Sequence, residues 1–253
     1  MDSPSVNDSR EIRFLRSRLA AWLPSSAFID VTTIGGHAAL PEEEILVRGA
    51  VDRRKEEFRT GRWLLRKGAR HLGRPARPIG IGPLRAPLWP EDILGSLSHD
   101  GALCIVALMA QNAPACPMGF GIDLVHLPEK TGRMNHLLPY YAESPDEAEQ
   151  VAQLDRDVDP ALLLFSLKES FVKALSVHVQ DYIDLSALRI GWGASPHVTY
   201  RTLSAAFKPF VARSDNYLLT AVQVFSPYHA LPGVRMTKRT SGQDDRSVHG
   251  APR

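Results

Sequence analysis

Acidic and basic residues in two separate segments could do chemistry together. Asp123 interrupts the apolar run GFGIDLV, although aspartate is unfavourable in strands. Glu169 and Lys173 lie four residues apart in FSLKESFVKAL, so a helix would place them on one face. Each feature also has an ordinary explanation, because Asp123 could cap a turn and Glu169–Lys173 could be an exposed ion pair. The functional interpretation of Asp123 is a carboxylate with a chemical role at the end of a strand.

Lys168 occupies an unusual position in the same helical segment. At 100° per residue, an apolar stripe forms on one side of the helix, and Lys168 lies beside it. That stripe contains Leu164, Leu167, Phe171, Ala174 and Leu175. The lysine stem could extend outward to solvent, or the ammonium could face an anion in a cleft.

Three small or polar residues precede an apolar run. Ser96, Ser98 and His99 lie just before ALCIVALMA, which is typical of a buried strand. Hydroxyls and an imidazole at this point could hold a phosphate, and a turn that caps itself is the alternative. A hydrolase is disfavoured, since neighbouring Ser and His side chains on a strand point to opposite faces. The sequence also lacks a G-x-S-x-G turn.

A row of basic residues lies along one side of the helix predicted over 52–72. The apolar residues of this helix recur every seven positions. The basic residues are Lys55, Arg59, Arg62, Arg66 and Arg70. Such a row is either a solvated face or a phosphate-binding surface. A nucleic-acid-binding module is the corresponding alternative function. The small net charge of +2 argues against that module, which also explains neither GFGIDLV nor FSLKESFVKAL.

The composition is that of an ordinary globular protein. The 253 residues include 44% hydrophobic and 23% charged residues, enough for one large domain or two small ones. Apolar runs are too short for a spanning helix, and the polar N-terminus does not resemble a signal peptide. The two cysteines, Cys104 and Cys116, form neither a disulfide framework nor a metal cluster. We therefore expect a cytoplasmic protein with no membrane partner.

The order of elements predicts an α+β protein in two halves. Helices are expected at 11–23, after Pro41, at 52–72, at 144–155 and from Pro160 onward. Strands are expected in FIDVTTI, ALCIVALMA and MGFGIDLVHL, followed by LRIGW, HVTYRTL, FKPFVA and NYLLTAVQVF. The Gly- and Pro-rich stretch between residues 73 and 90 predicts a long ordered loop. We expect one half over 1–117, a second over 118–230, and a disordered tail over 231–253.

The motif segments together resemble those of a known family. GIDL at 121–124 and FSLKESFVKAL at 165–175 resemble the two signature motifs of the phosphopantetheinyl transferases. RRKEEFRTGRWLLRKGARHLG and RAPLWPEDILGSLSH resemble the first-half helix and coenzyme-binding loop of the larger, surfactin- and enterobactin-type branch. The resemblance covers roughly residues 40–225. It implies a pseudo-duplicated two-half α/β fold with the active site between the halves.

The resemblance also implies an activity and its participants. Coenzyme A would donate its 4'-phosphopantetheine arm to a serine of an apo acyl or peptidyl carrier protein, leaving 3',5'-ADP. The reaction would depend on Mg²⁺, and nucleic acid would not be a partner. Because both halves lie in one chain, the enzyme could work as a monomer.

Roles for individual residues follow from the same resemblance. Asp123 and Glu169 would hold Mg²⁺, and Glu169, directly or through a metal-bound water, would be the base. Lys168 and Lys173 would contact the pyrophosphate. The remaining coenzyme contacts would come from Ser98 and His99, from Arg62, and from Arg54, Arg59 or Arg85 near the 3'-phosphate and adenine.

One position departs from the family pattern. The larger branch usually carries an acid two residues after the aspartate, and this chain has Val125 there. We expect Asp100, just after His99, or a water molecule to supply the missing metal ligand. A catalytically degenerate protein that binds coenzyme A is the alternative.

Overall fold

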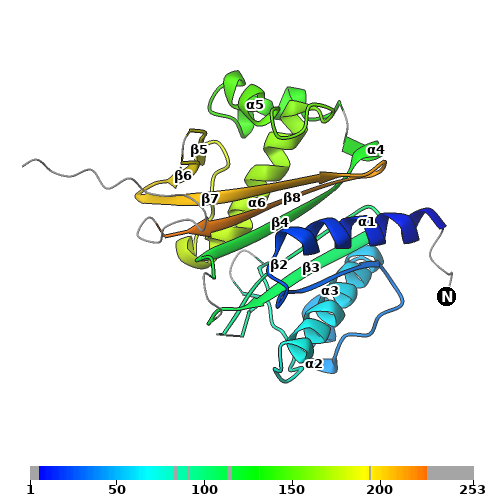
Figure 1. The fold of residues 1–253 in the computed structure, drawn as a ribbon. Coiled ribbons are helices and arrows are strands. Elements are labelled where there is room, and N and C mark those ends of the chain that lie inside the picture. The colour runs from blue at the N-terminus through cyan, green and yellow to red at the C-terminus, as the bar shows by residue number, and fades with distance from the viewer. Residues whose placement is uncertain are drawn as a thin grey trace, which may run out of the picture.

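The computed structural model describes residues 6–82, 85–90, 92–112, 116–130, 132–193 and 195–226. Its described strands form two antiparallel sheets (Figure 1). The three-stranded sheet has the order β1-β3-β2, with β1 (Phe28–Thr33), β2 (Ile93–Asp100) and β3 (Leu103–Ala110). The five-stranded sheet has the order β4-β8-β7-β6-β5. Its strands are β4 (Gly119–His126), β5 (Arg189–Gly191), β6 (His197–Tyr200), β7 (Leu203–Arg213) and β8 (Tyr217–Phe225).

The described helices are distributed over both sheets (Figure 1). They are α1 (Val6–Trp22), α2 (Pro41–Glu44), the 3-10 helix η1 (Ile45–Val47), α3 (Asp52–His71), α4 (Leu127–Lys130), the 3-10 helix η3 (Asn135–Tyr140), α5 (Pro145–Val151) and α6 (Pro160–Val179). Helix α3 packs on β3, and α6 packs on β4 and β8. The α+β prediction is therefore confirmed. The tail predicted over 231–253 lies outside the described residues.

Strand β2 is not predicted from the sequence, in which LGSLSHD only precedes the apolar run of the following strand. Glycine and serine are poor strand formers, so propensity gave no signal. Tertiary structure provides the reason for the strand, since β2 pairs along its length with β3.

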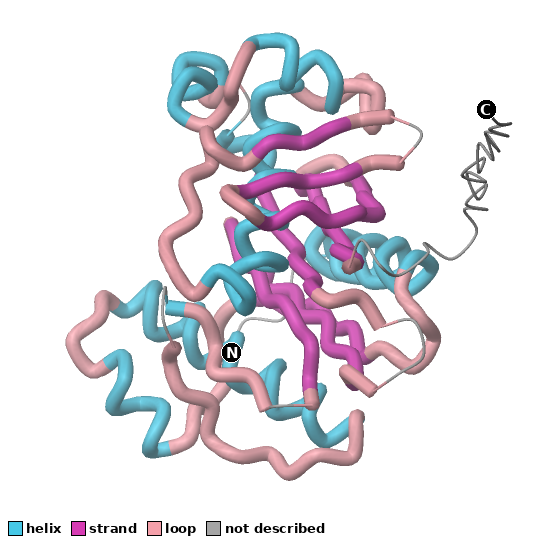
Figure 2. Tube along the Cα trace, turned by 90° about the vertical axis from the view of Figure 1, so that its left-hand side faces the viewer, coloured by secondary structure: helices cyan, strands magenta, loops and turns pink. Residues whose placement is uncertain are grey.

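Side chains of β2 join the two sheets. Strands β2 and β4 are the edge strands of their sheets and lie side by side. The strands of both sheets run one beside another through the middle of the molecule, with helices around them (Figure 2). Alternate β2 side chains accept hydrogen bonds from alternate backbone amides of β4. The pairs are Ser96 with Ile122 at 2.9 Å, Ser98 with Leu124 at 3.0 Å and Asp100 with His126 at 2.9 Å. These bonds satisfy amides that an open edge would leave unpaired, and they fix the position of β2 relative to β4.

Helix α6 approaches the face of β4 very closely. A Cβ atom at Gly121 would collide with the carbonyl oxygen of Ser170, and one at Gly119 would collide with that of Ala174. The glycines of GFGID therefore allow the backbone of α6 to lie directly against the strand. This contact brings the next residue on the same face, Asp123, up to the helix that carries Glu169 and Lys173.

Two members of the basic row on α3, Arg59 and Arg66, bind carboxylates within the protein. Arg59 binds Glu44 at 2.7 and 2.9 Å, and it also binds Glu56. Arg66 is buried, where it contacts Glu43 and donates to the Ala38 carbonyl. These arginines hold the segment before α3 against the helix. Among the residues that the structure describes, no helix is long and apolar enough to cross a membrane.

Candidate active site

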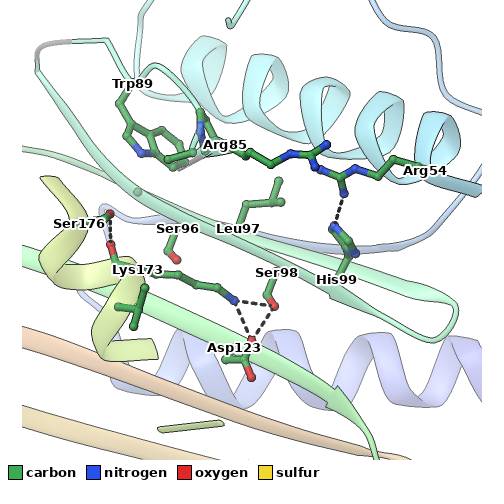
Figure 3. A pocket seen from close by; sticks show the side chains of 14 residues that line it. Arg54, Arg85, Trp89, Ser96, Leu97, Ser98, His99, Asp123, Lys173 and Ser176 are labelled. Atoms are coloured by element: carbon green, nitrogen blue, oxygen red, sulfur yellow. Dashed lines mark hydrogen bonds and ion pairs between the residues drawn. The ribbon is translucent and has the colours of Figure 1, made fainter. Parts of the chain in front are cut away.

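A cavity of about 330 Å³ opens where β2, β4, α3 and α6 come together (Figure 3). Its lining comes from widely separated parts of the chain. The residues are Arg54, Arg85, Ala86, Pro87, Trp89, Gly95, Ser96, Leu97, Ser98, His99, Asp123, Val172, Lys173 and Ser176. One end carries the carboxylate and ammonium pair, and the other carries the arginines and the histidine (Figure 3).

Asp123 lies at the acidic end of the cavity with both carboxylate oxygens engaged. Oδ1 accepts hydrogen bonds from Lys173 Nζ at 2.7 Å and from Ser98 Oγ at 3.2 Å. Oδ2 accepts from Ser166 Oγ at 2.9 Å. The aspartate is within β4 and only 8% exposed, so it is not a turn cap. The structure thus brings together Asp123, Ser98 and Lys173, three residues that the family resemblance assigns to the site.

A hydroxyl network beneath Asp123 was not predicted. Thr220 Oγ1 lies 2.9 Å from Ser166 Oγ and 2.8 Å from Ser170 Oγ, and all three residues are buried. The network ties α6 to β8 and orients the hydroxyl that binds Asp123. The spacing of Ser166 and Ser170, four residues apart on the helix of Glu169, was the signal that could have revealed it.

Glu169 is partly buried and has no hydrogen-bond or ion-pair partner among the described residues. Burial raises the pKa of its carboxyl, the charge of Asp123 raises it further, and Lys173 opposes both effects. Two neighbouring carboxylates therefore share the field of one lysine. Such a pair attracts a further cation or holds a proton.

Two cationic side chains and His99 form the other end of the cavity. Arg54 Nη1 lies 3.0 Å from His99 Nε2 and donates to Glu57 Oε2 at 3.2 Å. Burial lowers the pKa of His99, so its neutral ring can accept from Arg54. The Arg85 guanidinium approaches that of Arg54 (Figure 3). Arg85 has a φ of 63°, an uncommon conformation for arginine. Two facing guanidinium groups make this end attractive to phosphate.

Arg62 does not line the main cavity, and its guanidinium binds backbone carbonyls of the loop after α3. Its Nε donates to the Ile79 carbonyl at 2.7 Å, and Nη2 donates to the Gly80 carbonyl at 3.0 Å. Burial lowers its pKa to about 10. The side chain fixes the loop after α3 and lines an adjoining space of about 60 Å³, which shares Arg54, Arg85 and His99 with the main cavity.

Lys168 faces the protein interior, in contrast to both predicted orientations. Its Nζ donates to Glu147 Oε2 at 2.9 Å and to the Leu185 carbonyl at 3.0 Å. The residue is 0% exposed, and burial lowers the pKa of its ammonium group although Glu147 opposes the shift. It therefore joins α6 to α5 and to the loop around Leu185, away from the cavity.

Asp100, one of the two expected sources of the missing metal ligand, binds backbone amides in this structure. Asp100 Oδ1 accepts from Gly101 N and Oδ2 from His126 N, each at 2.9 Å, so Asp100 caps the turn after β2. Val125 is buried in an apolar cluster. Among the described residues, no group of three or more His, Cys, Asp or Glu could hold a metal ion.

The chemistry of the remaining donors still fits Mg²⁺. Asp123 and Glu169 lie close enough for each charge to affect the other, and Lys173 is their shared cation. Mg²⁺ is commonly bound by one or two carboxylates, with phosphate oxygens and water completing its shell. A two-carboxylate site that needs phosphate is therefore consistent with these residues.

Comparisons with known proteins match both halves of the chain to one family. Residues 42–109 match the 4'-phosphopantetheinyl transferase N-terminal domain, and residues 119–222 match the 4'-phosphopantetheinyl transferase superfamily. 4'-phosphopantetheinyl transferase Svp of Streptomyces mobaraensis is 35% identical, over 62% of this chain and 64% of the relative. 4'-phosphopantetheinyl transferase PptT of Mycobacterium tuberculosis is 30% identical, over 48% of this chain and 60% of the relative.

Enterobactin synthase component D of Escherichia coli O157:H7 is 28% identical, over 59% of this chain and 68% of the relative. The alignments to the first two relatives thus span less than two thirds of their length. The two family matches together still cover more than half of the chain and include Arg54, Asp123 and Glu169. The chain belongs to the 4'-phosphopantetheinyl transferase superfamily, in its enterobactin-type branch.

Proposed function

We propose that this protein transfers the 4'-phosphopantetheine arm of coenzyme A to a serine of an apo acyl or peptidyl carrier protein. One observation carries the proposal. A single cavity combines Asp123, the ammonium of Lys173 and a cationic end in a chain of this family, and Glu169 lies close enough to Asp123 for that charge to raise its pKa. The product would be the holo carrier protein, with 3',5'-ADP as the second product.

The two ends of the cavity suit different parts of coenzyme A. Arg54, Arg85 and His99 would hold the 3'-phosphate through charge-assisted hydrogen bonds. Lys173 and Ser98 would contact the pyrophosphate near Asp123. A ligand fixed at both ends presents its phosphorus atom to a nucleophile in a defined orientation, which can supply much of the rate enhancement.

Transfer would occur by displacement at the β-phosphorus of coenzyme A. The carrier serine oxygen forms the new P–O bond as the bond to the departing nucleotide breaks. Glu169, whose pKa is raised, is suited to accept the serine proton, and Lys173 would stabilise the departing phosphate. Mg²⁺, held by Asp123 and Glu169 with the pyrophosphate, would neutralise the phosphate charge when bound.

Intact-protein mass spectrometry of an apo carrier protein tests the proposal. The carrier is incubated with coenzyme A, Mg²⁺ and the wild-type protein, Glu169→Gln or Glu149→Gln. Glu149 is an exposed acid on α5, so its variant is the matched control. We expect one phosphopantetheine mass to appear with wild type and Glu149→Gln, and to be lost with Glu169→Gln or a chelator.

The same experiment separates transfer from binding alone. Carriers of fatty-acid, polyketide and peptide type should all be included. Folded protein that binds coenzyme A but modifies none of them would contradict the transferase proposal. That result would favour the degenerate alternative, for which the specific observation is the buried Val125.

A further inference from the structure

The ammonium of Lys173 lies against the Asp123 carboxylate, where a bound metal cation would also lie. Its Nζ is 2.7 Å from Asp123 Oδ1 and 3.0 Å from Ser98 Oγ. The side chains of Lys173 and Asp123 are 27% and 11% exposed, and both line the cavity. The ion pair can therefore be reached from the cavity and exchanged for other charges.

The charges at this end of the cavity restrict what can replace the lysine. Asp123 and Glu169 when ionised carry two negative charges, and Lys173 carries one positive charge. A divalent cation entering alone would reverse the net charge and place two cations beside one carboxylate. A divalent cation entering with a diphosphate diester, which has two negative charges, leaves the net charge unchanged. Charge balance thus favours binding of the divalent cation together with the diphosphate diester.

The Asp123 carboxylate stays oriented when the lysine leaves. Oδ2 keeps its hydrogen bond from Ser166 Oγ, and Ser98 Oγ still donates to Oδ1. Ser98 is itself held by the Leu124 amide. The Lys173 side chain reaches across the cavity from α6 (Figure 3), so its ammonium has room to turn toward a ligand phosphate.

We propose that Lys173 is an internal counter-ion that competes with the metal for Asp123 until the diphosphate of coenzyme A draws the ammonium away. The metal and coenzyme A then bind with positive coupling. This inference rests on the proposed metal-dependent function. It adds that Lys173 lowers the metal affinity of the coenzyme-free protein, whereas a lysine that only contacts substrate would leave that affinity unchanged.

Direct binding of Mn²⁺ provides the test. Free Mn²⁺ is measured by electron paramagnetic resonance in titrations of wild type, Lys173→Met and Lys173→Gln, with and without coenzyme A. Mn²⁺ bound by coenzyme A alone is subtracted. Lys208→Met, which removes an exposed lysine on β7, is the matched control, and Asp123→Asn removes the site.

Without coenzyme A, we expect both Lys173 variants to bind Mn²⁺ about tenfold more tightly than wild type. Coenzyme A should tighten Mn²⁺ binding strongly in wild type and in Lys208→Met, and much less in the Lys173 variants. Asp123→Asn should bind weakly in every condition.

Two different results would overturn the inference, and they have different meanings. Equal coenzyme-free affinity in wild type and both Lys173 variants, with normal binding when coenzyme A is present, refutes the counter-ion role alone. Absence of Mn²⁺ binding to wild type even with coenzyme A refutes the metal-dependent function and the inference together.

Discussion

Helix α6 forms two lysine–carboxylate pairs that have similar geometry and different surroundings. Lys168 binds Glu147 at 2.9 Å, and Lys173 binds Asp123 at 2.7 Å. The first pair has side-chain exposures of 0% and 8% and a further bond to a backbone carbonyl. The second pair lies on the wall of the cavity. Residue type and bond length therefore do not distinguish a structural pair from an exchangeable one, whereas access to the cavity does.

Helix geometry separates the two lysines. Residues five positions apart differ by about 140° around a helix of 3.6 residues per turn. Lys168 thus points toward α5 and Leu185, while Lys173 points toward β2 and β4. We call Lys168–Glu147 the interior pair and Lys173–Asp123 the cavity pair. Replacement of one partner should lower the stability of the protein at the interior pair, and should change its activity at the cavity pair.

Lys168→Met should have the largest effect. It leaves the Glu147 carboxylate buried without its cation, and Glu147 Oε1 already lacks a hydrogen-bond partner. Loss of one partner of a buried pair typically costs about 3–5 kcal/mol of the free energy of unfolding. Urea unfolding followed by circular dichroism would measure this change.

The double variant Lys168→Met with Glu147→Met is the control for that experiment. Two apolar side chains fill the same space without a stranded charge, so most of the lost stability should return. Wild-type stability in Lys168→Met, combined with a raised KM for coenzyme A, would instead support the coenzyme contact expected from the family resemblance.

Asp123→Asn should remove activity while the protein stays folded. The amide keeps the side-chain shape, but it cannot bind Lys173 and a metal as a carboxylate does. We expect kcat to fall by about 10²–10³, comparable to the loss of one group that stabilises charge in a transition state. Rates of holo-carrier formation would measure it.

Asp146→Asn is the matched control, since Asp146 is an exposed acid on α5. It should retain the wild-type rate. If Asp123→Asn also retained the wild-type rate, the cavity pair would be structural, and its contrast with the interior pair would disappear.

The parts of the site that sequence could predict are those set by local spacing. The helical repeat places Glu169 near Lys173. Asp123 could be identified as a candidate because an aspartate is unusual within an apolar strand. Those patterns depend only on the element that contains them. The strand β2 lacked such a pattern, since its Gly and Ser residues are stabilised by β3 and β4 rather than by their own propensity.

Three residues that the family resemblance assigns to the site bind protein groups that are distant in sequence. Lys168 meets Glu147 across 21 residues, Arg62 meets Ile79 across 17, and Asp100 meets the His126 amide across 26. A charged side chain has the same local pattern whether it faces a ligand or a buried carboxylate. Only packing of the surrounding elements distinguishes these cases.

Substitution at the cationic end should have an intermediate effect. Arg54→Gln or Arg85→Gln removes one charged contact to the 3'-phosphate, worth about 1.4 kcal/mol, or a tenfold rise in KM for coenzyme A. The kcat should change little, because these residues lie away from the reacting phosphorus. Steady-state kinetics with varied coenzyme A would measure both constants.

Arg62→Gln provides the contrast at this end. It loses its bonds to the Ile79 and Gly80 carbonyls, so its main effect should be on the free energy of unfolding. A tenfold rise in KM for Arg62→Gln with unchanged stability would show that Arg62 reaches the coenzyme after all.

The smallest expected effect is on stability: besides the loss of transfer, Glu169→Gln should slightly stabilise the coenzyme-free protein. Folding raises the pKa of Glu169 above its ordinary value of 4.5, so the folded state binds more protons than the unfolded state between these two values. Stability is therefore lost as pH rises through that window, and the neutral glutamine avoids the loss. Urea unfolding should show a gain of about 0.5–1 kcal/mol at pH 7.5.

The gain should vanish below pH 4.5, where Glu169 is protonated in both states. Glu149→Gln, an exposed change, should show no such pH dependence. A Glu169→Gln protein less stable than wild type at pH 7.5 would mean that Lys173 fully compensates both carboxylates. The cavity pair would then be as closed to a further cation as the interior pair of Lys168 and Glu147, and the metal site would need another source of negative charge.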